Sequence, residues 1–259
     1  MQPPVGKVNV LGVGVSVLNL KLASEIILNA VRTRQKGFIA VTGVHGVSEA
    51  QSDAEFRRIL NSAFLNTPDG MPMSWLGRLQ GFSHMDRVYG PDLMLKICQA
   101  TQNGGVRHFL YGGVPGVAEA LEKALVKRFP GLCVCGCYTP PFRPLNTQEE
   151  EALKRQLVSC RPDIFWVGLS TPKQEKFMAA YYDSLPATIM IGVGAAFDIL
   201  AGRKGQAPRW MQRSGLEWLF RLAQEPRRLW KRYLINNPLF VLRILGQFTR
   251  VKQYSLELQ

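Results

Sequence analysis

Among the residues that could do chemistry, Asp69 stands out because it occupies a Pro-Asp-Gly turn. The turn lies in the stretch NTPDGMPMSWLGRLQG, residues 66–81, between an apolar run and a stretch with helical character. Turn chemistry alone accounts for Pro68, Asp69 and Gly70. The same turn could hold a carboxylate within hydrogen-bond reach of a substrate hydroxyl, where it would accept a proton. Asp69 is therefore either a turn residue only or a carboxylate presented to a substrate.

Further loops have a composition typical of ligand-binding loops. Each is rich in Gly, Thr, Ser or Pro and lies between an apolar run and a helix-like segment: VTGVHG (41–46), NTPDG (66–70), LYGGVPG (110–116), VGLSTPKQE (167–175) and GVGAAFD (192–198). Small residues let a backbone approach a ligand closely, and helix starts offer free N–H groups to phosphates. None of these loops matches the phosphate-loop or dinucleotide fingerprint. Nucleotide binding is therefore predicted from the position of the loops between strands and helices, and not from a sequence motif.

The elements that carry these loops alternate between strand-like and helix-like segments. Short apolar runs predict strands over residues 8–16, 37–43, 62–67, 106–113, 132–138, 163–170 and 187–194. Apolar residues at three-and-four spacing predict helices over residues 20–34, 47–63, 91–104, 115–129, 147–160 and 172–185. Such a βα repeat predicts an α/β fold with a doubly wound, mainly parallel, Rossmann-like sheet, whose ligands bind beyond the carboxyl ends of the strands.

Size and composition indicate a folded protein. The chain has 259 residues, of which 46% are hydrophobic, enough to bury a sizeable core. No apolar stretch reaches the roughly 18 residues needed to cross a bilayer, and the first residues lack the pattern of a signal peptide. We therefore expect a cytoplasmic protein. The cysteines at 133, 135 and 137 alternate, which predicts reduced, buried thiols on one face of a strand.

The net charge of +13 is concentrated at the C-terminal end. Residues 203–259 carry 12 basic and 3 acidic residues, a net +9, whereas residues 1–202 carry 20 and 16, a net +4. We therefore divide the chain into an α/β catalytic domain (1–202) and a basic helical appendage (203–259) of two or three helices broken near Pro226 and Pro238. Basic helices with interleaved aromatics suit an anionic membrane surface. Alternatively, their apolar faces pack on the domain and the cations are only solvated.

Longer motifs give the chain a resemblance to a known family. They are DGMPMSWLGRLQG followed by DRVYGPDLM, FLYGGVPGVAEALE, VGLSTPKQEKF, and the block from GVGAAFDILAGRKGQAPRW to EPRRLWKRYL. In these motifs the chain resembles the WecG/TagA/CpsF glycosyltransferases, which extend lipid-linked sugars in bacterial surface polysaccharide assembly. The resemblance implies an inverting, metal-independent transferase without a cofactor. It implies a UDP-sugar donor and a sugar on a polyprenyl diphosphate as acceptor.

The resemblance also assigns roles to residues. It makes Asp69 the general base, and it makes arginines of the appendage the groups that stabilise the departing UDP in place of a metal. Arg221 and Arg228 are the leading candidates because a spacing of seven would put them on one helical face, followed by Lys231 and Arg232. The other substrate-binding candidates are Thr42, His45, Arg87, Gly112, Gly113, Gly168, Lys173, Gln174 and Asp198.

One departure from the family pattern concerns the sugar. Many members carry Asn two positions after the Thr of the first loop, whereas this chain has Val44 there and His45 next. His45 either faces the sugar pocket or packs at a helix start. The donor therefore stays open between N-acetylmannosamine, a plain hexose such as glucose, and a uronic acid.

Other functions fit the composition less well. A basic nucleic-acid-binding protein is the first alternative, but the charge is concentrated in one appendage and no nucleic-acid module is recognisable. A nucleotide-sugar-modifying enzyme is the second, but the dinucleotide fingerprint is missing. We expect no nucleic-acid partner, attachment to the inner face of the plasma membrane, and a homo-oligomer as one possible state.

Overall fold

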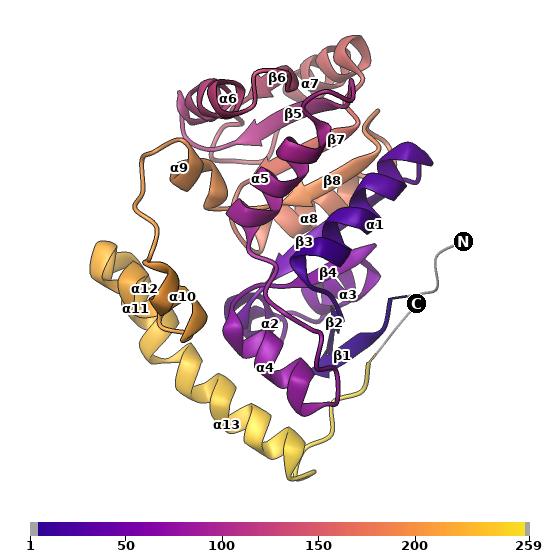
Figure 1. Cartoon of the computed structure of the whole chain (residues 1–259). Coiled ribbons are helices and arrows are strands. Elements are labelled where there is room, and N and C mark those ends of the chain that lie inside the picture. The colour runs from indigo at the N-terminus through magenta and orange to yellow at the C-terminus, as the bar shows by residue number, and fades with distance from the viewer. Residues whose placement is uncertain (1–4, 257–259) are drawn as a thin grey trace. The chain divides into compact units, whose positions relative to one another are not determined.

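A computed structural model describes residues 5–256 and confirms the expected α/β fold (Figure 1). The main sheet has six strands in the order β4-β3-β8-β7-β5-β6. Adjacent strands from β3 through β8, β7 and β5 to β6 are paired in parallel. Its strands are β3 (Gly37–Thr42), β4 (Leu65–Pro68), β5 (Arg107–Gly112), β6 (Cys133–Tyr138), β7 (Ile164–Gly168) and β8 (Ile189–Gly192).

The chain divides into two compact units, each built from separate stretches of sequence. Unit 1 comprises Met1–Leu20, Val41–Tyr89 and Gln206–Gln259, and unit 2 comprises Lys21–Ala40 and Gly90–Gly205. The boundary that the charge distribution suggests, at residue 202, lies three residues before the last junction between the units. That residues 1–202 form a catalytic domain separate from the appendage stays a prediction.

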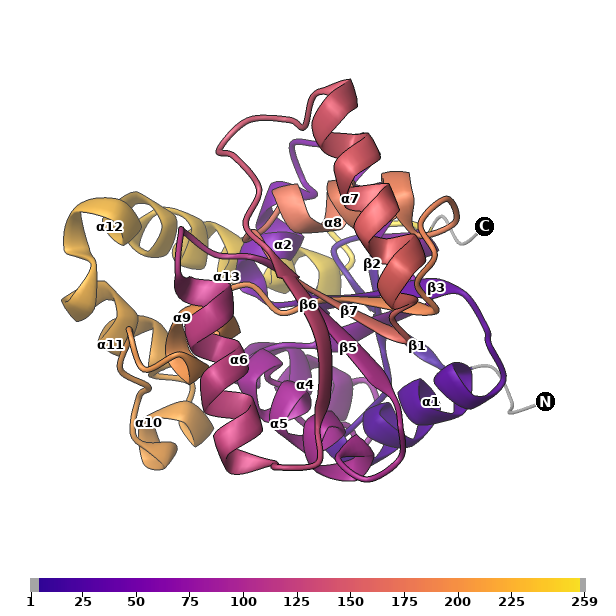
Figure 2. The same ribbon diagram turned by 90° about the horizontal axis from the view of Figure 1, so that it is seen from above.

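Unit 2 contains most of the sheet and the helices that cover it. The helices are α1 (Leu20–Arg32), α5 (Gly90–Thr101), α6 (Val117–Arg128), α7 (Thr147–Cys160), α8 (Lys173–Tyr181) and α9 (Ala196–Leu200). Figure 2 shows α7 and α8 on one face of the sheet and α1, α5 and α6 on the other. With both faces covered, β7 and β8 are buried almost throughout, which explains why their sequences lack alternation.

Unit 1 begins with a two-stranded antiparallel sheet instead of a single strand. The apolar run 8–16 predicts one strand, but it forms a hairpin of β1 (Lys7–Val10) and β2 (Val13–Ser16) that is separate from the main sheet. Leu11 and Gly12 form the two-residue turn. Both have positive φ, 54° and 83°, which is what a type I′ hairpin turn requires. The sequence prediction was wrong here because Leu at a left-handed position gives no turn signal.

The middle of unit 1 contains two short helices where the sequence predicts one, and a third after the Pro-Asp-Gly turn. They are α2 (Val44–Glu49), α3 (Ala54–Ser62) and α4 (Met71–Leu79). The first break is local, because the Asp53 side chain accepts a hydrogen bond from the Phe56 amide at 2.9 Å and starts α3 as a new helix.

The C-terminal part of unit 1 forms four helices, one more than the upper number predicted: α10 (Arg209–Arg213), α11 (Glu217–Gln224), α12 (Pro226–Leu234) and α13 (Asn236–Phe248). Helix breaks lie near Pro226 and near Pro238 as expected: Pro226 opens α12, and α13 begins two residues before Pro238, whose first-turn position needs no amide partner within the helix. None of the described helices is long and apolar enough to cross a membrane.

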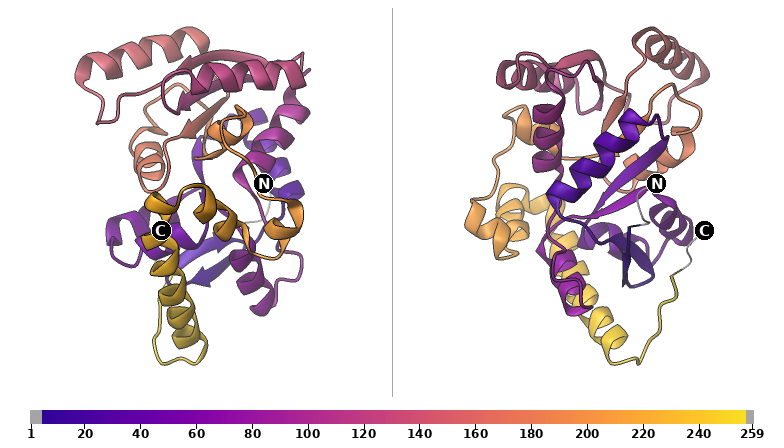
Figure 3. Two further views of the ribbon diagram at one scale, coloured as in Figure 1. Left: turned by 90° about the vertical axis from the view of Figure 1, so that its left-hand side faces the viewer. Right: turned by 45° about the vertical axis from the view of Figure 1, so that its right-hand side comes forward.

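After α13, drawn in yellow, the chain turns back toward the N-terminal hairpin of the same unit (Figure 3). The Gln247 side chain accepts from the Leu11 amide at 2.8 Å and donates to the Asn9 carbonyl at 2.9 Å. The Asn9 side chain donates to the Tyr254 carbonyl at 2.6 Å. These bonds tie the two ends of the described chain together.

The cysteines of β6 do not share one face as the alternating sequence predicts. Val134 pairs with His108 and Gly136 with Phe109, so Cys135 is the extra residue of a β-bulge. Cys135 contacts Cys160 of α7, whereas the Cys137 thiol lies 3.3 Å from a carboxylate oxygen of α6. All five cysteines are free thiols, but the three of β6 are not buried as predicted: Cys133 is exposed, and Cys135 and Cys137 are partly exposed.

Candidate active site

Asp69 follows β4 and precedes α4, so the turn presents its carboxylate at the carboxyl end of a strand of the main sheet. The Asp69 amide donates to the Thr42 carbonyl at 2.9 Å, which joins this turn to the end of β3. Gly70 has a φ of 83° and opens α4, a conformation that L side chains rarely adopt. Residues 68–70 thus form the turn that the sequence predicts, and this turn fixes the position of the Asp69 carboxylate.

Gly43 shows how closely the first loop approaches this turn. A Cβ added to Gly43 would lie 2.9 Å from the Asp69 carbonyl oxygen and 3.7 Å from the carboxylate Oδ2. Only glycine therefore fits between β3 and α2 without displacing the backbone of Asp69. The absence of a side chain also leaves the carboxylate next to the start of α2.

Burial makes Asp69 a stronger base than an ordinary aspartate. The atoms packed around the carboxylate raise its pKa from 3.8 to about 6, although the residue keeps some solvent access. Arg87, Arg221 and Arg232 oppose this shift, whereas the charge of Glu217 adds to it. A base with a pKa near neutrality is largely ionised at pH 7 and still has appreciable proton affinity.

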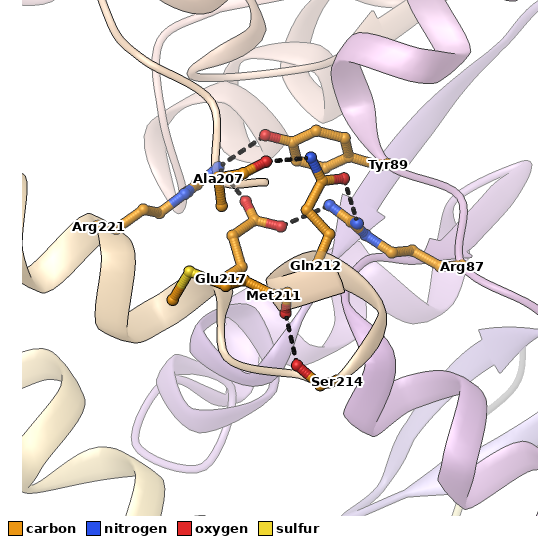
Figure 4. A network of polar contacts seen from close by, with 8 residues as sticks. All are labelled: Arg87, Tyr89, Ala207, Met211, Gln212, Ser214, Glu217 and Arg221. Carbon is orange, nitrogen blue, oxygen red and sulfur yellow. Dashed lines mark hydrogen bonds and ion pairs between the residues drawn. The ribbon is translucent and has the colours of Figure 1, made fainter. Parts of the chain in front are cut away.

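A network of polar side chains, shown in Figure 4, surrounds Arg87. Arg87 Nη2 donates to Glu217 Oε2 at 2.5 Å, and Nη1 donates to Gln212 Oε1 at 2.8 Å. The Gln212 amide nitrogen in turn donates to the Ala207 carbonyl at 2.7 Å. Arg87 comes from the segment before Tyr89, whereas Gln212 and Glu217 come from α10 and α11. The network therefore joins the C-terminal helices to the rest of unit 1.

Tyr89 and Arg221 complete this network. The Arg87 guanidinium lies 3.9 Å from the centre of the Tyr89 ring, and Arg221 Nη2 donates to the Tyr89 hydroxyl at 3.4 Å. Arg221 Nη2 also lies 3.1 Å from Glu217 Oε1. Burial, and then the charge of Glu217, raise the pKa of Tyr89, so its hydroxyl stays neutral. The Glu217 carboxylate thus contacts two guanidinium groups, that of Arg87 through Oε2 and that of Arg221 through Oε1.

The other cations of the appendage divide into buried and exposed. Arg221 and Arg228 lie on successive helices, α11 and α12, so the expectation that they share one helical face was wrong. Arg228 pairs with Glu225 at 2.8 Å, its side chain 62% exposed, and Lys231 is exposed beside the Trp230 ring. The helix break at Glu225 and Pro226 causes this difference, because it restarts the helical phase.

Arg232, which the sequence placed behind Arg221 and Arg228 as a candidate, is one of the cations whose charge acts on Asp69. Burial lowers the pKa of Arg232. Its Nε atom is buried and has no hydrogen-bond partner among the described residues. A buried guanidinium with an unused donor is a candidate for binding an anion.

Thr42 and His45 lie at the end of β3 and the start of α2. Thr42 is buried, and its hydroxyl has no hydrogen-bond partner within the part of the chain that the structure describes. His45 Nδ1 lies 3.5 Å from Glu49 Oε1, one turn along α2. Thr42 therefore offers a hydroxyl without a partner in the described residues, in a residue whose carbonyl accepts from the Asp69 amide, whereas His45 lies one helical turn from Glu49.

The predicted glycines of unit 2 bring backbones together at the ends of β5 and β7. The Gly113 amide donates to the Gly168 carbonyl at 3.1 Å, and a Cβ on Gly112 would lie 2.6 Å from the same oxygen. A Cβ on Gly168 would lie 2.6 Å from the Phe197 ring. Close packing alone thus requires glycine here, and their contact with a nucleotide stays a prediction.

Gln174 and Glu175 form a buried polar pair at the start of α8. Glu175 Oε1 accepts from Gln174 Nε2 at 3.0 Å and from the Thr171 hydroxyl at 2.8 Å. Gln174 Oε1 and Glu175 Oε2 are buried without a partner among residues 5–256. Burial raises the pKa of Glu175.

The two remaining candidates of unit 2 lie nearer the surface. Lys173 is exposed, and its ammonium lies 4.6 Å from the centre of the Phe142 ring. Asp198 Oδ2 lies 3.4 Å from the Lys204 ammonium. Within the described residues no three His, Cys, Asp or Glu side chains gather in a way that could hold a metal ion.

The sequence predictions thus fall into two groups. Unit 1 brings together Asp69, Thr42, Arg87, Arg221 and Arg232 at one site, and unit 2 contains the predicted glycines with Lys173, Gln174 and Asp198. Sequence reasoning missed the residues that hold these groups: Tyr89, Glu175, Gln212 and Glu217. Only Glu217 carries a sequence signal, because it precedes Arg221 by one helical turn, the spacing of an ion pair.

Comparisons with known proteins show what the chain is similar to. The model of the WecG/TagA/CpsF glycosyl transferase family matches residues 8–254. An N-acetylglucosaminyldiphosphoundecaprenol N-acetyl-beta-D-mannosaminyltransferase from Bacillus spizizenii is 32% identical over 215 residues, 82% of this chain and 80% of the relative. Enzymes of the same name from Bacillus subtilis and Staphylococcus aureus are 29% and 24% identical, over 79% and 83% of this chain and 77% and 82% of the relatives.

Proposed function

Because the chain belongs to the WecG/TagA/CpsF glycosyltransferase family and is a glycosyltransferase, we propose that it moves a sugar from a UDP-sugar to a lipid-linked acceptor. The acceptor is a sugar on a polyprenyl diphosphate, and the configuration of the transferred sugar is inverted. The observation that carries the proposal is the buried carboxylate of Asp69 within reach of the charges of three arginines.

In the proposed reaction, each part of this cluster has one task. The acceptor hydroxyl attacks the anomeric carbon, Asp69 takes the hydroxyl proton, and the bond from that carbon to the diphosphate oxygen breaks as the new bond forms. UDP leaves with the electron pair of the broken bond. Arg221 and Arg232, with Arg87, supply the positive charge that stabilises it, which is the task a metal ion performs in other transferases.

The relatives support a particular donor and acceptor. Their names describe transfer of N-acetylmannosamine to N-acetylglucosaminyldiphosphoundecaprenol. We therefore propose UDP-N-acetylmannosamine as the first donor to test, and this lipid as the first acceptor. Val44 and His45 are the reason to test glucose beside it, because the family pattern has Asn at position 44.

A lipid-linked acceptor requires the enzyme to work at a membrane surface, and α13 has the features for that contact. Its inner side is anchored by Phe240 and Ile244, which are buried. Its outer side exposes a stripe of large apolar residues, Leu239, Leu242, Leu245 and Phe248. Residues 203–259 carry a net +9. An apolar stripe within a basic segment binds anionic bilayers in two ways: the apolar side chains enter the interface, and the cations are attracted to the anionic lipids.

The test of the reaction is a donor panel. Purified protein receives N-acetylglucosaminyldiphosphoundecaprenol and, in parallel, UDP-N-acetylmannosamine, UDP-glucose, UDP-N-acetylglucosamine and UDP-glucuronate, each with and without EDTA. We expect one donor to turn over in EDTA and the Asp69→Asn variant to lose at least about 100-fold in kcat. Turnover abolished by EDTA, or full activity of the variant, would refute the proposed mechanism.

The test of the membrane contact is co-sedimentation with vesicles containing phosphatidylglycerol. Leu242→Ser with Leu245→Ser removes the middle of the stripe, and Val158→Ser is a matched control because Val158 is 57% exposed on α7. We expect the double variant to lose binding and the control to keep it. Equal binding by both variants would place the lipid contact elsewhere.

A further inference from the structure

We infer that Glu217 is a positioning residue that holds Arg87 and Arg221 away from the Asp69 carboxylate. This inference rests on the proposed function, in which Asp69 takes a proton and the arginines stabilise the leaving group. Both tasks fail if an arginine pairs with Asp69 instead, because the pair neutralises the base and occupies the cation. The cluster therefore needs a second carboxylate that keeps the arginines in place.

The geometry of Glu217 fits this task. Its two oxygens are divided between two partners: Oε2 accepts from Arg87 at 2.5 Å, and Oε1 lies 3.1 Å from Arg221 Nη2. The Glu217 and Arg87 side chains are only 18% and 10% exposed, so water screens these pairs weakly. The other contacts of the arginines, to Gln212 and Tyr89, are with neutral groups. Glu217 is thus the anion that orients both guanidinium groups.

The charges that face Asp69 show what removal of Glu217 would do. The largest charge effects on Asp69 come from the cations Arg87, Arg221 and Arg232 and from the anion Glu217. Without Glu217, two half-buried guanidinium groups would lose their anionic partner, and Asp69 would be the carboxylate of the cluster left to receive them. A nearby opposite charge stabilises the ionised carboxylate and lowers its proton affinity. The burial that raises the pKa of Asp69 would then be opposed by three cations, without the charge of Glu217 to offset them.

The Glu217→Gln variant tests this inference, because it keeps the shape of the side chain and removes its charge. We expect the pKa of Asp69 to fall by about one pH unit. We expect the acid limb of the kcat/KM profile to move down with it and kcat at its plateau to fall about tenfold or more, since a weaker base accepts a proton less readily. The KM for the UDP-sugar should rise as well, because an arginine drawn to Asp69 no longer contacts the diphosphate.

The pKa of Asp69 can be measured without turnover, by NMR titration of protein labelled with ¹³C at the aspartate carboxyl carbons. The Asp69→Asn variant identifies the resonance. Glu151→Gln is the matched control, because Glu151 is exposed on α7 and faces an exposed arginine, Arg155, at 4.0 Å. It should leave both the titration and the rate profile unchanged.

The outcomes separate this inference from the proposed function. An Asp69 pKa that stays the same or rises in Glu217→Gln, in a folded protein, overturns the inference, whatever the activity. A fall in the pKa with an unmoved acid limb of the rate profile also overturns it. If the wild-type enzyme turns over none of the donors, the proposed reaction fails, while the titration still decides what Glu217 does to Asp69.

Discussion

Replacement of Asp69 by its neutral isostere, asparagine, should stabilise the fold. Burial raises the pKa of Asp69 from 3.8 to about 6, so the folded state holds a proton more tightly than the unfolded state does. Stability therefore falls as pH rises from about 4 to about 6 and stays low above that range. At about 1.4 kcal/mol per pH unit, ionised Asp69 costs the folded state up to about 3 kcal/mol at pH 7.5. Asp69→Asn should recover most of this free energy.

The assay is thermal unfolding of both proteins across a series of pH values from 4 to 8. At pH 7.5 the variant should melt higher by up to roughly 6–12 °C, and the difference should nearly vanish at pH 4. Asp86→Asn is the control, because its carboxylate is 57% exposed and pairs with the exposed Arg78, a contact worth about 0–1 kcal/mol. A variant that melts at or below the wild-type temperature at pH 7.5 would refute the desolvation of Asp69.

Two further predictions concern other buried groups. Burial lowers the pKa of His108 from 6.5 to about 4, and its Nδ1 accepts from Trp166 Nε1 at 3.0 Å. Stability should therefore be lost as pH falls from 6.5 toward 4, and His108→Gln should remove this loss; denaturant midpoints in the Asp69→Asn background measure it without overlap of the two titrations. Gly43→Ala should cost about 1–3 kcal/mol and most of the turnover, because its Cβ would press on the Asp69 carbonyl at 2.9 Å. Gly246→Ala, which meets no atom within 4 Å, should cost neither in the same melting and turnover assays.

The sequence was sufficient where a local pattern determines the structure. The βα pattern predicted the sheet and its covering helices, because buried parallel strands appear as short apolar runs and amphipathic helices as apolar residues at three-and-four spacing. It failed for the hairpin around Leu11 and Gly12, where tertiary packing imposes a left-handed leucine. It also failed for Arg221 and Arg228, because the helix break at Pro226 resets the helical phase.

The candidate site shows the same division. The turn at Asp69 and the glycine beside it could be read from residue types, since both depend on local backbone conformation. The environment of the carboxylate could not, because Arg87 and Glu217 are 130 residues apart and meet only in the folded chain. Residues such as Tyr89 and Gln212, which orient other side chains, carry no pattern of their own in one sequence.

The discontinuous make-up of unit 1 affects the order in which the protein can mature on the ribosome. Every residue of unit 2 has been synthesised once position 205 is reached, whereas unit 1 still lacks Gln206–Gln259 at that point. The base and Arg87 emerge early, but Glu217, Arg221 and the bond from Asn9 to Tyr254 require the last part of the chain. Because domains generally fold as units during synthesis, we expect unit 2 to fold first. The cluster around Asp69 is then completed only after residues 206–232 have been synthesised, so a nascent chain that has not reached them carries Asp69 without Arg221 and Arg232.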